Sequence, residues 1–553
     1  MCFGMMGTVG AADLTIQTPA ERCGFTSYSQ YEEIGLFLSR LSAASDRISL
    51  RIVGRTHPDR NYEARDLTLV ILSAEGADSP ATLHRDKPTV YFVAAKHGNE
   101  QSAKEAVLQL IRDLAVGDLR PLLDSINVLV LPQANPFGNR FDQRSNEQDL
   151  DLNRDQVKLE SPESETINRV FVEWMPEVTL DIHEKGDDYY RVSIGCVSNA
   201  NIHKDLERFS RETILKEVEA GLRSKRITFQ EYLITQRMGI DSSAGVTYRP
   251  EDSGAGQMMK RYSTSDLNDG RNSPGIYETL SFIQEGASRH DLETLKDRTR
   301  WQYFGLRTFI ESAARHAAEI RDLVRSRRAE LLERAKTYSE NDPVHLRMKY
   351  ARDPKNPTLT IKKFVRSASP VRGVLKVDKK AGETLTAADL LPHRGDRDVR
   401  IEDERVRNWF PLVEPTISVP RPLGYLIPAE MSLVVETLLK HGVVVQVLTK
   451  DVSLAAEVYH VKSIEPAGYD YLPPSSISLE KENREILAKQ GDYYISCVQP
   501  AANLIPCLLE PETQYGFIRY RIFKLVPETG DYFPIKRIVK KQNMERVTYR
   551  NWR

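Results

Sequence analysis

The chain has 553 residues, of which 40% are hydrophobic and 28% are charged. This balance excludes a wholly disordered chain, and the length leaves room for about two to four domains of roughly 150 residues. Lysine and arginine number 77 against 78 aspartates and glutamates, which argues against a dominant role in binding nucleic acid or anionic membranes. The sequence contains no apolar run of the roughly 18 residues that a membrane-spanning helix needs.

Residues 1–26 form an N-terminal segment. Residues 1–12 carry no charged side chain and end in small residues, as the apolar and cleavage regions of a secretory signal do. A frayed, mildly apolar N-terminus explains the same run, because no basic residues precede it. The compartment therefore stays open, with an extracytoplasmic location slightly favoured over a cytoplasmic one.

Residues 27–340 show the alternation of strands and helices that is typical of an α/β domain. Continuous apolar runs predict strands that are buried on both faces. Strands that alternate with helices predict a mixed, mainly parallel sheet with helices on both faces. The strands are predicted at 49–54, 66–73, 88–95, 126–133 and 178–183, and the helices at 99–115, at 203–222 and, as one or two long helices packed on the sheet, at 290–336.

From residue 341 the composition changes, and short β-type runs are separated by turns that contain proline and glycine. Residues 341–553 are therefore predicted to form a β-rich C-terminal domain with a helix at 429–440. Two roles are open for this domain: a packing module, or a wall or lid that limits access to an active site. Its β-type runs are 358–364, 373–377, 442–448, 456–461, 493–498 and 516–523.

Two of the predicted strands end in residues that can bind a metal ion. His97 and Glu100 follow the strand 88–95 with the spacing His-x-x-Glu, and His183 ends the strand 178–183. Ligands of open α/β sheets bind beyond the carboxyl ends of the strands, so these side chains are expected to meet at one edge. Two imidazoles and one carboxylate are a ligand set for catalytic zinc.

The order of motifs along the chain resembles that of the zinc carboxypeptidases, the carboxypeptidase A-like metallopeptidases. The motifs are His-Gly-Asn-Glu at 97–100, Asn-Pro-Phe-Gly at 135–138, Arg144, Asp-Leu-Asn-Arg at 151–154, Asp-Ile-His at 181–183 and Glu285. This resemblance implies the carboxypeptidase-like α/β/α fold and one zinc ion per chain. It also implies hydrolysis of the last peptide bond of a substrate with a free C-terminus.

The same resemblance assigns a role to each residue at the metal. His97, Glu100 and His183 would bind zinc, and Asp151 would orient the imidazole of the first zinc histidine. A hydrogen bond of that kind is what a metal-bound imidazole normally needs. The C-terminal tail resembles those appended to some bacterial carboxypeptidase-like proteins, whose role is open.

By resemblance, three further residues would contact the substrate. Arg144 would polarise the scissile carbonyl, and Asn153 and Arg154 would bind the terminal carboxylate. The structural alternatives are ion pairing at the surface for the arginines and turn capping for Asn153. A planar guanidinium is well suited to a carboxylate because it can donate two parallel hydrogen bonds.

The general base is predicted at Glu285, because the apolar run 280–283 leads straight into it. Glu278 is the alternative, but it precedes this predicted strand. A tyrosine caps the pocket in the digestive relatives, and Tyr262 and Tyr277 are the candidates for it here, although either could be structural. The segment 261–275, expected to shape the side-chain pocket, is polar, which argues against a large apolar pocket.

Two other functions stay open beside a carboxypeptidase. One is a zinc amidohydrolase of the same fold, acting on a non-protein or cell-wall amide. The other is a non-catalytic binding protein in which the β-rich half recognises a partner. The second alternative leaves the metal ligands, Arg144 and Glu285 unexplained. The preferred terminal residue and the oligomeric state are not predicted.

Overall fold

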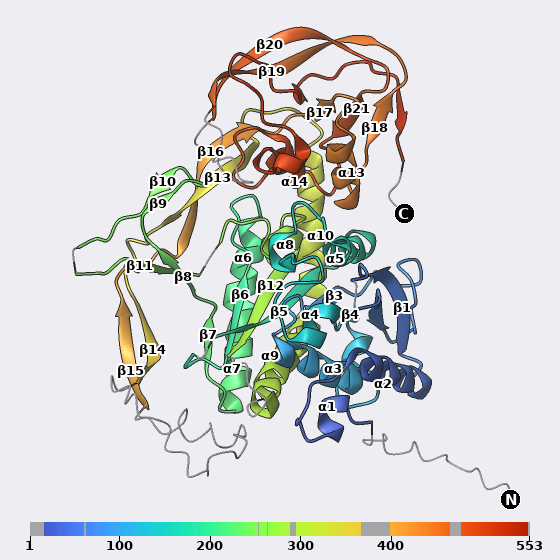
Figure 1. Ribbon diagram of the computed structural model, residues 1–553, viewed down its shortest axis with the longest axis vertical. Coiled ribbons are helices and arrows are strands. Elements are labelled where there is room, and N and C mark those ends of the chain that lie inside the picture. Colours follow the sequence, from blue (N-terminus) through green and yellow to red (C-terminus); the bar gives the residue numbers. More distant parts are fainter. Residues whose placement is uncertain are drawn as a thin grey trace, which may run out of the picture.

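The computed structural model (Figure 1) describes residues 16–59, 62–186, 188–252, 254–262, 264–287, 295–366, 399–464 and 477–550. The signal-like run 1–12 and the predicted β-type run 373–377 lie outside these ranges. Within them, no helix combines the length and the apolar character that crossing a membrane requires.

A mixed sheet with the strand order β1-β2-β4-β3-β5-β12-β6-β7 forms the centre of the N-terminal half. Four of its seven pairings are parallel: β4–β3, β3–β5, β5–β12 and β6–β7. The predicted mixed, mainly parallel sheet is therefore confirmed. Its strands are β1 (Ile48–Arg55), β2 (Asp66–Leu72), β3 (Thr89–Ala94), β4 (Asn127–Leu131), β5 (Val178–Lys185), β6 (Val192–Cys196), β7 (Phe229–Glu231) and β12 (Leu280–Ala287).

Helices cover both faces of this sheet. Successive residues of a strand point to opposite faces. In β3, the Phe92 ring packs edge-on against Phe309 of α9, whereas the neighbouring Tyr91 hydroxyl donates to the carbonyl of Ile167 in α5. All six residues of β3 are buried as a result, which explains why this strand is a continuous apolar run.

The helices of this half are short except for α2, α3, α5 and the pair α9 and α10. The long run predicted at 290–336 is two helices that meet at His316, and the helix predicted at 203–222 is interrupted by a π-helical turn over Ser210–Leu215. The helices are α1 (Pro19–Arg22), α2 (Tyr31–Ala44), α3 (Gln101–Ala115), α4 (Pro136–Phe141), α5 (Pro162–Trp174), α6 (Lys204–Phe209), α7 (Lys216–Ser224), α8 (Asn272–Gly275), α9 (Leu295–Arg315) and α10 (Ala317–Arg334).

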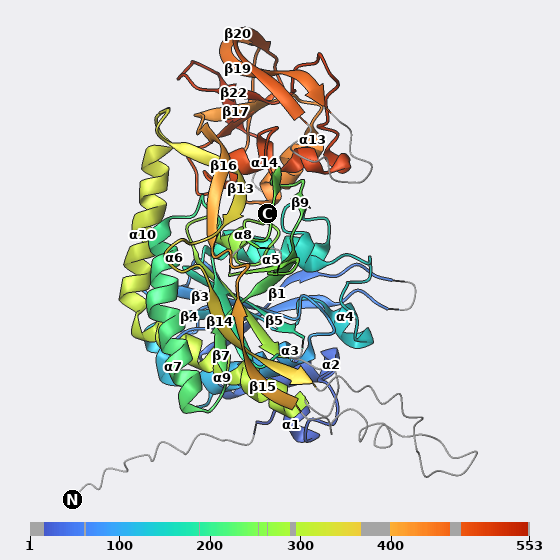
Figure 2. The ribbon, with the colours of Figure 1, turned by 90° about the vertical axis from the view of Figure 1, so that its left-hand side faces the viewer.

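Between β7 and α8, small two-stranded sheets form from β8 (Ile234–Arg237) with β11 (Met258–Arg261) and from β9 (Ile240–Asp241) with β10 (Val246–Thr247). In the turned view, α10 runs along the N-terminal half and rises toward the C-terminal half (Figure 2). The chain then enters the β-rich region.

The C-terminal half contains two strand pairs, β13–β16 and β14–β15, and a sheet of order β20-β19-β22-β17-β21-β18-β23. This confirms its β-rich character, and the predicted helix at 429–440 is α13 (Ser432–Lys440). Its other elements are β13 (Pro343–Ala351), β14 (Leu359–Arg366), β15 (Val399–Val406), β16 (Leu412–Pro420), β17 (Gly424–Ile427), β18 (Gln446–Leu448), β19 (Val452–Ile464), β20 (Ile477–Ala488), β21 (Tyr493–Ser496), α14 (Leu504–Leu509), β22 (Lys536–Ile538) and β23 (Arg546–Thr548).

One β-type run of this half was predicted wrongly. Residues 516–523 form two short 3-10 turns, Phe517–Arg519 and Arg521–Phe523, in place of a strand. The turns bring the rings of Phe517 and Phe523 within 4.3 Å of each other. Phe517, Ile518 and Phe523 are therefore buried without a strand partner, whereas Ile522 is exposed. The boundary predicted at 340 stays a prediction, because one hydrophobic cluster contains residues from both halves.

Candidate active site

The turn after β3 brings His97 and Glu100 to the carboxyl edge of the central sheet. Ala95 leaves the strand in the left-handed conformation, with φ of 61°, and α3 begins directly after Glu100. A β-carbon on Gly98 would lie 2.0 Å from the carbonyl carbon of Gly138, so only glycine lets these two loops pack this closely. His183 joins them from the end of the adjacent strand β5.

The three predicted ligands form one buried cluster. The Nδ1 atom of His97 lies 2.7 Å from Oε1 of Glu100, and Nδ1 of His183 lies 2.8 Å from Oε2 of the same carboxylate. The two Nδ1 atoms are 3.0 Å apart. Burial alone would raise the pKa of Glu100, but the imidazoles of His183 and His97 lower it to about 2.

This arrangement fits a tetrahedral metal ion such as zinc. In a tetrahedral site with zinc bonds of about 2.0–2.1 Å, ligand atoms lie about 3.3 Å apart, close to the separations in the cluster. Two imidazole nitrogens that face each other across one carboxylate are also poorly satisfied by hydrogen bonds alone, whereas all three groups can donate electron pairs to a cation. Among the described residues, the only other group that combines histidine with acidic side chains in this way is His460 with Glu480 and Glu482 on the β19–β20 pair.

A carboxylate supports the first histidine on its other ring nitrogen. Asp151 Oδ1 accepts from Nε2 of His97 at 3.1 Å, and Oδ2 accepts from Nε of Arg144 at 2.9 Å. The backbone NH of Asn153 donates to Oδ1 as well, at 2.9 Å. Burial acts to raise the pKa of Asp151, but the His97 hydrogen bond and the Arg144 charge hold it well below its usual range. Asp151 thus orients His97 and Arg144 together.

The second histidine has a similar partner that sequence reasoning missed. Oδ2 of Asp181 lies 2.9 Å from Nε2 of His183 and also 2.9 Å from Nζ of Lys96. The side chains of Lys96 and Asp181 are each 3% exposed. Residues two apart on a strand point to the same face, so the sequence Asp-Ile-His carried a signal for Asp181. The sequence carried no such signal for the contact of Lys96 with Asp181, because the two residues come from different strands of the sheet.

Changing Asp181 to asparagine should weaken zinc binding by about 10–100-fold, because loss of a partner to a ligating histidine typically has this effect. Titration against a competing chelator measures it. Asp403→Asn is the matched control, since Asp403 is 62% exposed and lies on β15. Unchanged zinc affinity in Asp181→Asn would remove Asp181 from the metal site.

Glu285 lies beside the metal cluster on the neighbouring strand. In the parallel pairing of β12 with β5, Glu285 is the register partner of His183. It is 7% exposed. Burial raises its pKa to about 7, although the His183 charge acts in the opposite direction. A carboxyl group with a pKa near neutrality can both accept and return a proton.

Glu278, the alternative candidate for the general base, lies away from the metal cluster. Its Oε2 accepts from the backbone NH of His203 at 2.9 Å, and its Oε1 accepts from Nδ2 of Asn503 at 3.1 Å. These contacts tie the turn before β12 to α6 and to the C-terminal half. The structure therefore does not bring Glu278 to the metal cluster.

A cavity of about 430 Å³ opens in front of the cluster. Its wall brings together the substrate-contacting residues expected from the sequence, and the predicted polar segment 261–275 supplies part of it. Asp269 in this segment is held by two hydrogen bonds from Arg271, at 2.8 and 3.0 Å. The lining includes Arg144, Asn153, Arg154, Arg261, Asp266 and Glu285.

The tyrosine in this cavity is neither of the two candidates. Tyr277 is buried and donates to the carbonyl of His441 at 2.7 Å, and Tyr262 packs edge-on against Trp409. Tyr232, which follows β7, lines the cavity. The charge of Glu285 and burial raise the pKa of Tyr232 well above its usual value, which indicates that the two side chains are neighbours.

The C-terminal half supports this cavity from behind. The hydroxyl of Tyr350 accepts from the backbone NH of Ser265, that of Tyr515 lies 3.3 Å from Oγ of Ser265, and that of Tyr520 accepts from Asn268. Among the described residues that line the cavity, none comes from 341–550. These contacts favour a packing role for this half over a wall in direct contact with substrate.

Comparison with known proteins points to one family. Residues 37–180 match the zinc carboxypeptidase family. Carboxypeptidase 2 of Trichophyton rubrum is 24% identical over 525 residues, which cover 91% of this chain and 85% of that protein. Carboxypeptidase 2 of Trichophyton tonsurans is 24% identical over 505 residues, 87% of this chain and 81% of that protein. The similarity to these fungal proteins thus extends well beyond the N-terminal half.

Solved structures of metallo-carboxypeptidases also overlie part of the chain. One from Pseudomonas aeruginosa is 19% identical, with a TM-score of 0.38, and covers 53% of this chain and 70% of its own. One from Burkholderia cenocepacia is 16% identical, with a TM-score of 0.39, and covers 52% and 70%. The motifs, the His97–Glu100–His183 cluster and the sequence matches agree in one respect: the chain is similar to the zinc carboxypeptidases, the family that residues 37–180 match.

Proposed function

We propose that the protein is a zinc metallocarboxypeptidase that removes the last residue of a peptide with a free C-terminus. The observation that carries this proposal is one cavity that brings a two-histidine, one-carboxylate cluster together with the buried Glu285 and with Arg144 and Arg154. Each of these groups has a distinct part in peptide-bond hydrolysis. The match of residues 37–180 to the zinc carboxypeptidase family supports the same function.

His97, Glu100 and His183 would hold one zinc ion per chain. When bound, zinc supplies Lewis-acid chemistry, which makes water acidic enough to ionise near neutral pH and polarises a carbonyl group. Asp151 and Asp181 keep the two imidazoles in the orientation that presents both Nδ1 atoms to the metal. Lys96 offsets the charge of Asp181, so the second carboxylate is buried without being left unpaired.

Glu285 is the proposed general base. Its carboxylate takes a proton from the attacking water and passes it to the nitrogen of the leaving amine. The burial that raises its pKa to about 7 suits both transfers. Tyr232 stands beside it and can donate a hydrogen bond to the reacting groups or to the carboxylate.

Arg144 is the proposed stabiliser of the negative charge that develops on the carbonyl oxygen. Its Nη1 lies 3.2 Å from Nδ1 of His97, so the guanidinium is already beside the cluster, and Asp151 fixes its Nε. The loss of one such donor typically raises a barrier by about 3–4 kcal/mol. Arg154 and Asn153, on the same wall, bind the terminal carboxylate and thereby select the last peptide bond.

The experiment that tests this function is product mass spectrometry on a peptide library, with and without a chelator. Stepwise loss of C-terminal residues that stops when zinc is removed supports the proposal. Internal cuts, or cleavage of only non-peptide amides, would favour an amidohydrolase of the same fold.

Changing His183 to alanine should remove most of the zinc, because two of three protein ligands hold a catalytic zinc ion poorly. Purified wild-type protein should contain about one zinc per chain, since a site of this type binds one ion. Elemental analysis after dialysis measures both. His460→Ala, in the histidine and glutamate group on the β19–β20 pair, should keep the wild-type content. Full zinc in His183→Ala would show that the ligand assignment is wrong.

A further inference from the structure

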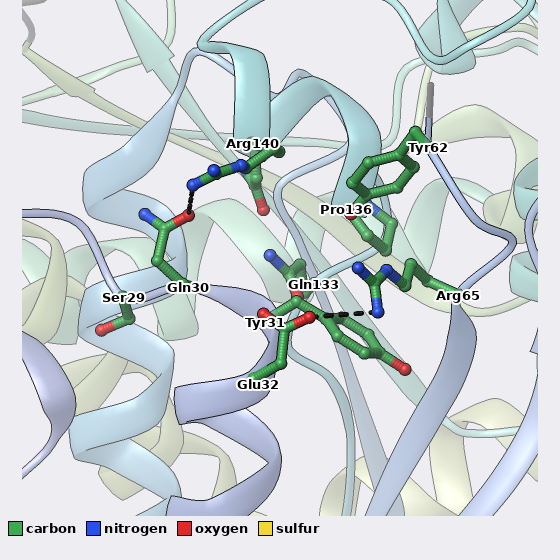
Figure 3. A pocket seen from close by; sticks show the side chains of 10 residues that line it. Ser29, Gln30, Tyr31, Glu32, Tyr62, Arg65, Gln133, Pro136 and Arg140 are labelled. Carbon is green, nitrogen blue, oxygen red and sulfur yellow. Dashed lines mark hydrogen bonds and ion pairs between the residues drawn. The ribbon is translucent and has the colours of Figure 1, made fainter. Parts of the chain in front are cut away.

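A second cavity, of about 200 Å³, lies at the N-terminal end of α2 (Figure 3). Its walls come from three parts of the chain: the start of α2 with the residues before it, the segment that leads into β2, and the turn from β4 together with α4. Within the described residues it shares no lining residue with the cavity at the metal cluster. It is therefore a separate candidate site.

The floor of this cavity is an amide group without a partner. Gln133 is 8% exposed, it lines the cavity, and the described part of the chain offers its side chain no hydrogen bond. The amide atoms of Gln133 are not fully enclosed by protein, so they are open to the space of the cavity and can hydrogen-bond to a group that fills it. The amide of Gln133 presents two donor hydrogens and one acceptor oxygen to whatever fills the space.

The mouth of the cavity carries charges of both signs, as Figure 3 shows. Arg140 is exposed and uses one nitrogen on Oε1 of Gln30, at 3.0 Å. Glu32 is 63% exposed and pairs through Oε1 with Arg65, also at 3.0 Å. The rings of Tyr31 and Tyr62 each lie 5.0 Å from the Arg65 guanidinium and hold it in place. Arg140 on α4 and Glu32 on α2 therefore supply one positive and one negative charge to the lining of the cavity.

The cavity also contacts the loop that carries the metal ligands. Asn139, in its wall, donates from Nδ2 to the carbonyl of Gly98 at 2.7 Å. Gly98 lies between His97 and Glu100. This hydrogen bond links the wall of the cavity to the loop that carries the metal ligands.

We propose that this cavity binds a free α-amino acid. A zwitterion carries a hydrogen-bond donor group and an acceptor group a short distance apart. These two groups are complementary to the acceptors and donors that Gln133, Arg140 and Glu32 offer. The α-carboxylate would accept from Arg140 and from Nε2 of Gln133, and the ammonium group would donate to Oε1 of Gln133 and to Glu32. The proposal does not rest on the proposed function, because the two cavities are separate.

Isothermal titration of the zinc-loaded full chain tests this site, with L-alanine, L-glutamine and L-lysine as probes of three side-chain classes. At least one is expected to bind saturably, and its N-acetyl and C-amide derivatives should bind at least tenfold more weakly. Gln133→Leu should abolish this binding, and Arg140→Ala, a change at an exposed residue, should weaken it at least tenfold. Gln490→Leu, at an exposed glutamine of the C-terminal half, should bind like wild type.

Three results would overturn the proposal. Binding that survives in Gln133→Leu and Arg140→Ala but disappears in Arg154→Met would place the amino acid in the cavity at the metal. Equal binding of the N-acetyl derivative would indicate a simple anion site. The absence of saturable binding by all three amino acids would indicate that water alone satisfies Gln133.

Discussion

Changing Glu285 to glutamine is expected to lower kcat by about 10²–10⁴-fold, the usual contribution of a general base, while the protein keeps its zinc. Glutamine preserves the size and the packing of the side chain in β12 but cannot accept a proton. Glu285 makes none of the contacts that hold the metal cluster together, so the zinc content should not change. Initial rates on a free-acid peptide and elemental analysis of the same preparation measure the two quantities.

Glu278→Gln is the matched control for this prediction. Glu278 is also buried and its pKa is also raised to about 7 by burial, yet it accepts hydrogen bonds from His203 and Asn503 away from the cavity. The control variant should therefore keep most of the activity, with at most a modest loss of stability. An active Glu285→Gln protein beside an inactive Glu278→Gln protein would transfer the role of base to Glu278.

The central sheet and the metal cluster were predictable because their signals are local. A strand that is covered on both faces must be apolar throughout, and β3 and β4 have that pattern. Residues at the carboxyl ends of such strands lie at the same edge of the sheet, so the sequence alone predicted that His97 and His183 lie close together. The motif order supplied the rest of the cluster.

Contacts that depend on packing between distant segments were not predictable. Lys96 reaches Asp181 only because β3 and β5 are neighbours in the sheet, and Tyr232 reaches the cavity only because β7 pairs with β6. The prediction of a strand at 516–523 failed for the same reason. Its alternation of apolar residues looks like a strand, but its rings are buried by a pair of turns, which a pattern of two-residue period does not distinguish.

The support of the cavity by the C-terminal half is a further long-range feature. Tyr350, Tyr515 and Tyr520 contact the segment that carries Asp266 and Asp269, although more than 80 residues separate the first contact pair and about 250 the others. The selectivity of the cavity should therefore depend on both halves of the chain, even though only the first half lines it.

A peptide with a free C-terminus should be trimmed, whereas its C-terminally amidated twin should resist by a factor of about 10²–10⁴. The amide cannot accept two charge-assisted hydrogen bonds, each worth about 1.5–3 kcal/mol. The carboxylate of the free-acid peptide would be bound by Arg154 and Asn153, which line the same wall of the cavity. Cleavage of the two peptides in parallel, followed by mass spectrometry, measures the ratio.

Arg154→Lys tests the residue behind this selectivity. Lysine keeps the charge but cannot donate two parallel hydrogen bonds to a carboxylate. The loss of one charge-assisted hydrogen bond, about 1.5–3 kcal/mol, should lower kcat/KM for the free-acid peptide by about 10–150-fold. The rate on the amidated peptide and the zinc content should hardly change, because neither depends on that bond.

Arg223→Lys, at a surface arginine that is 77% exposed, should behave like wild type. Equal cleavage of both peptides by the wild-type enzyme, or an Arg154→Lys protein that keeps full discrimination, would separate Arg154 from carboxylate recognition and favour an amidohydrolase.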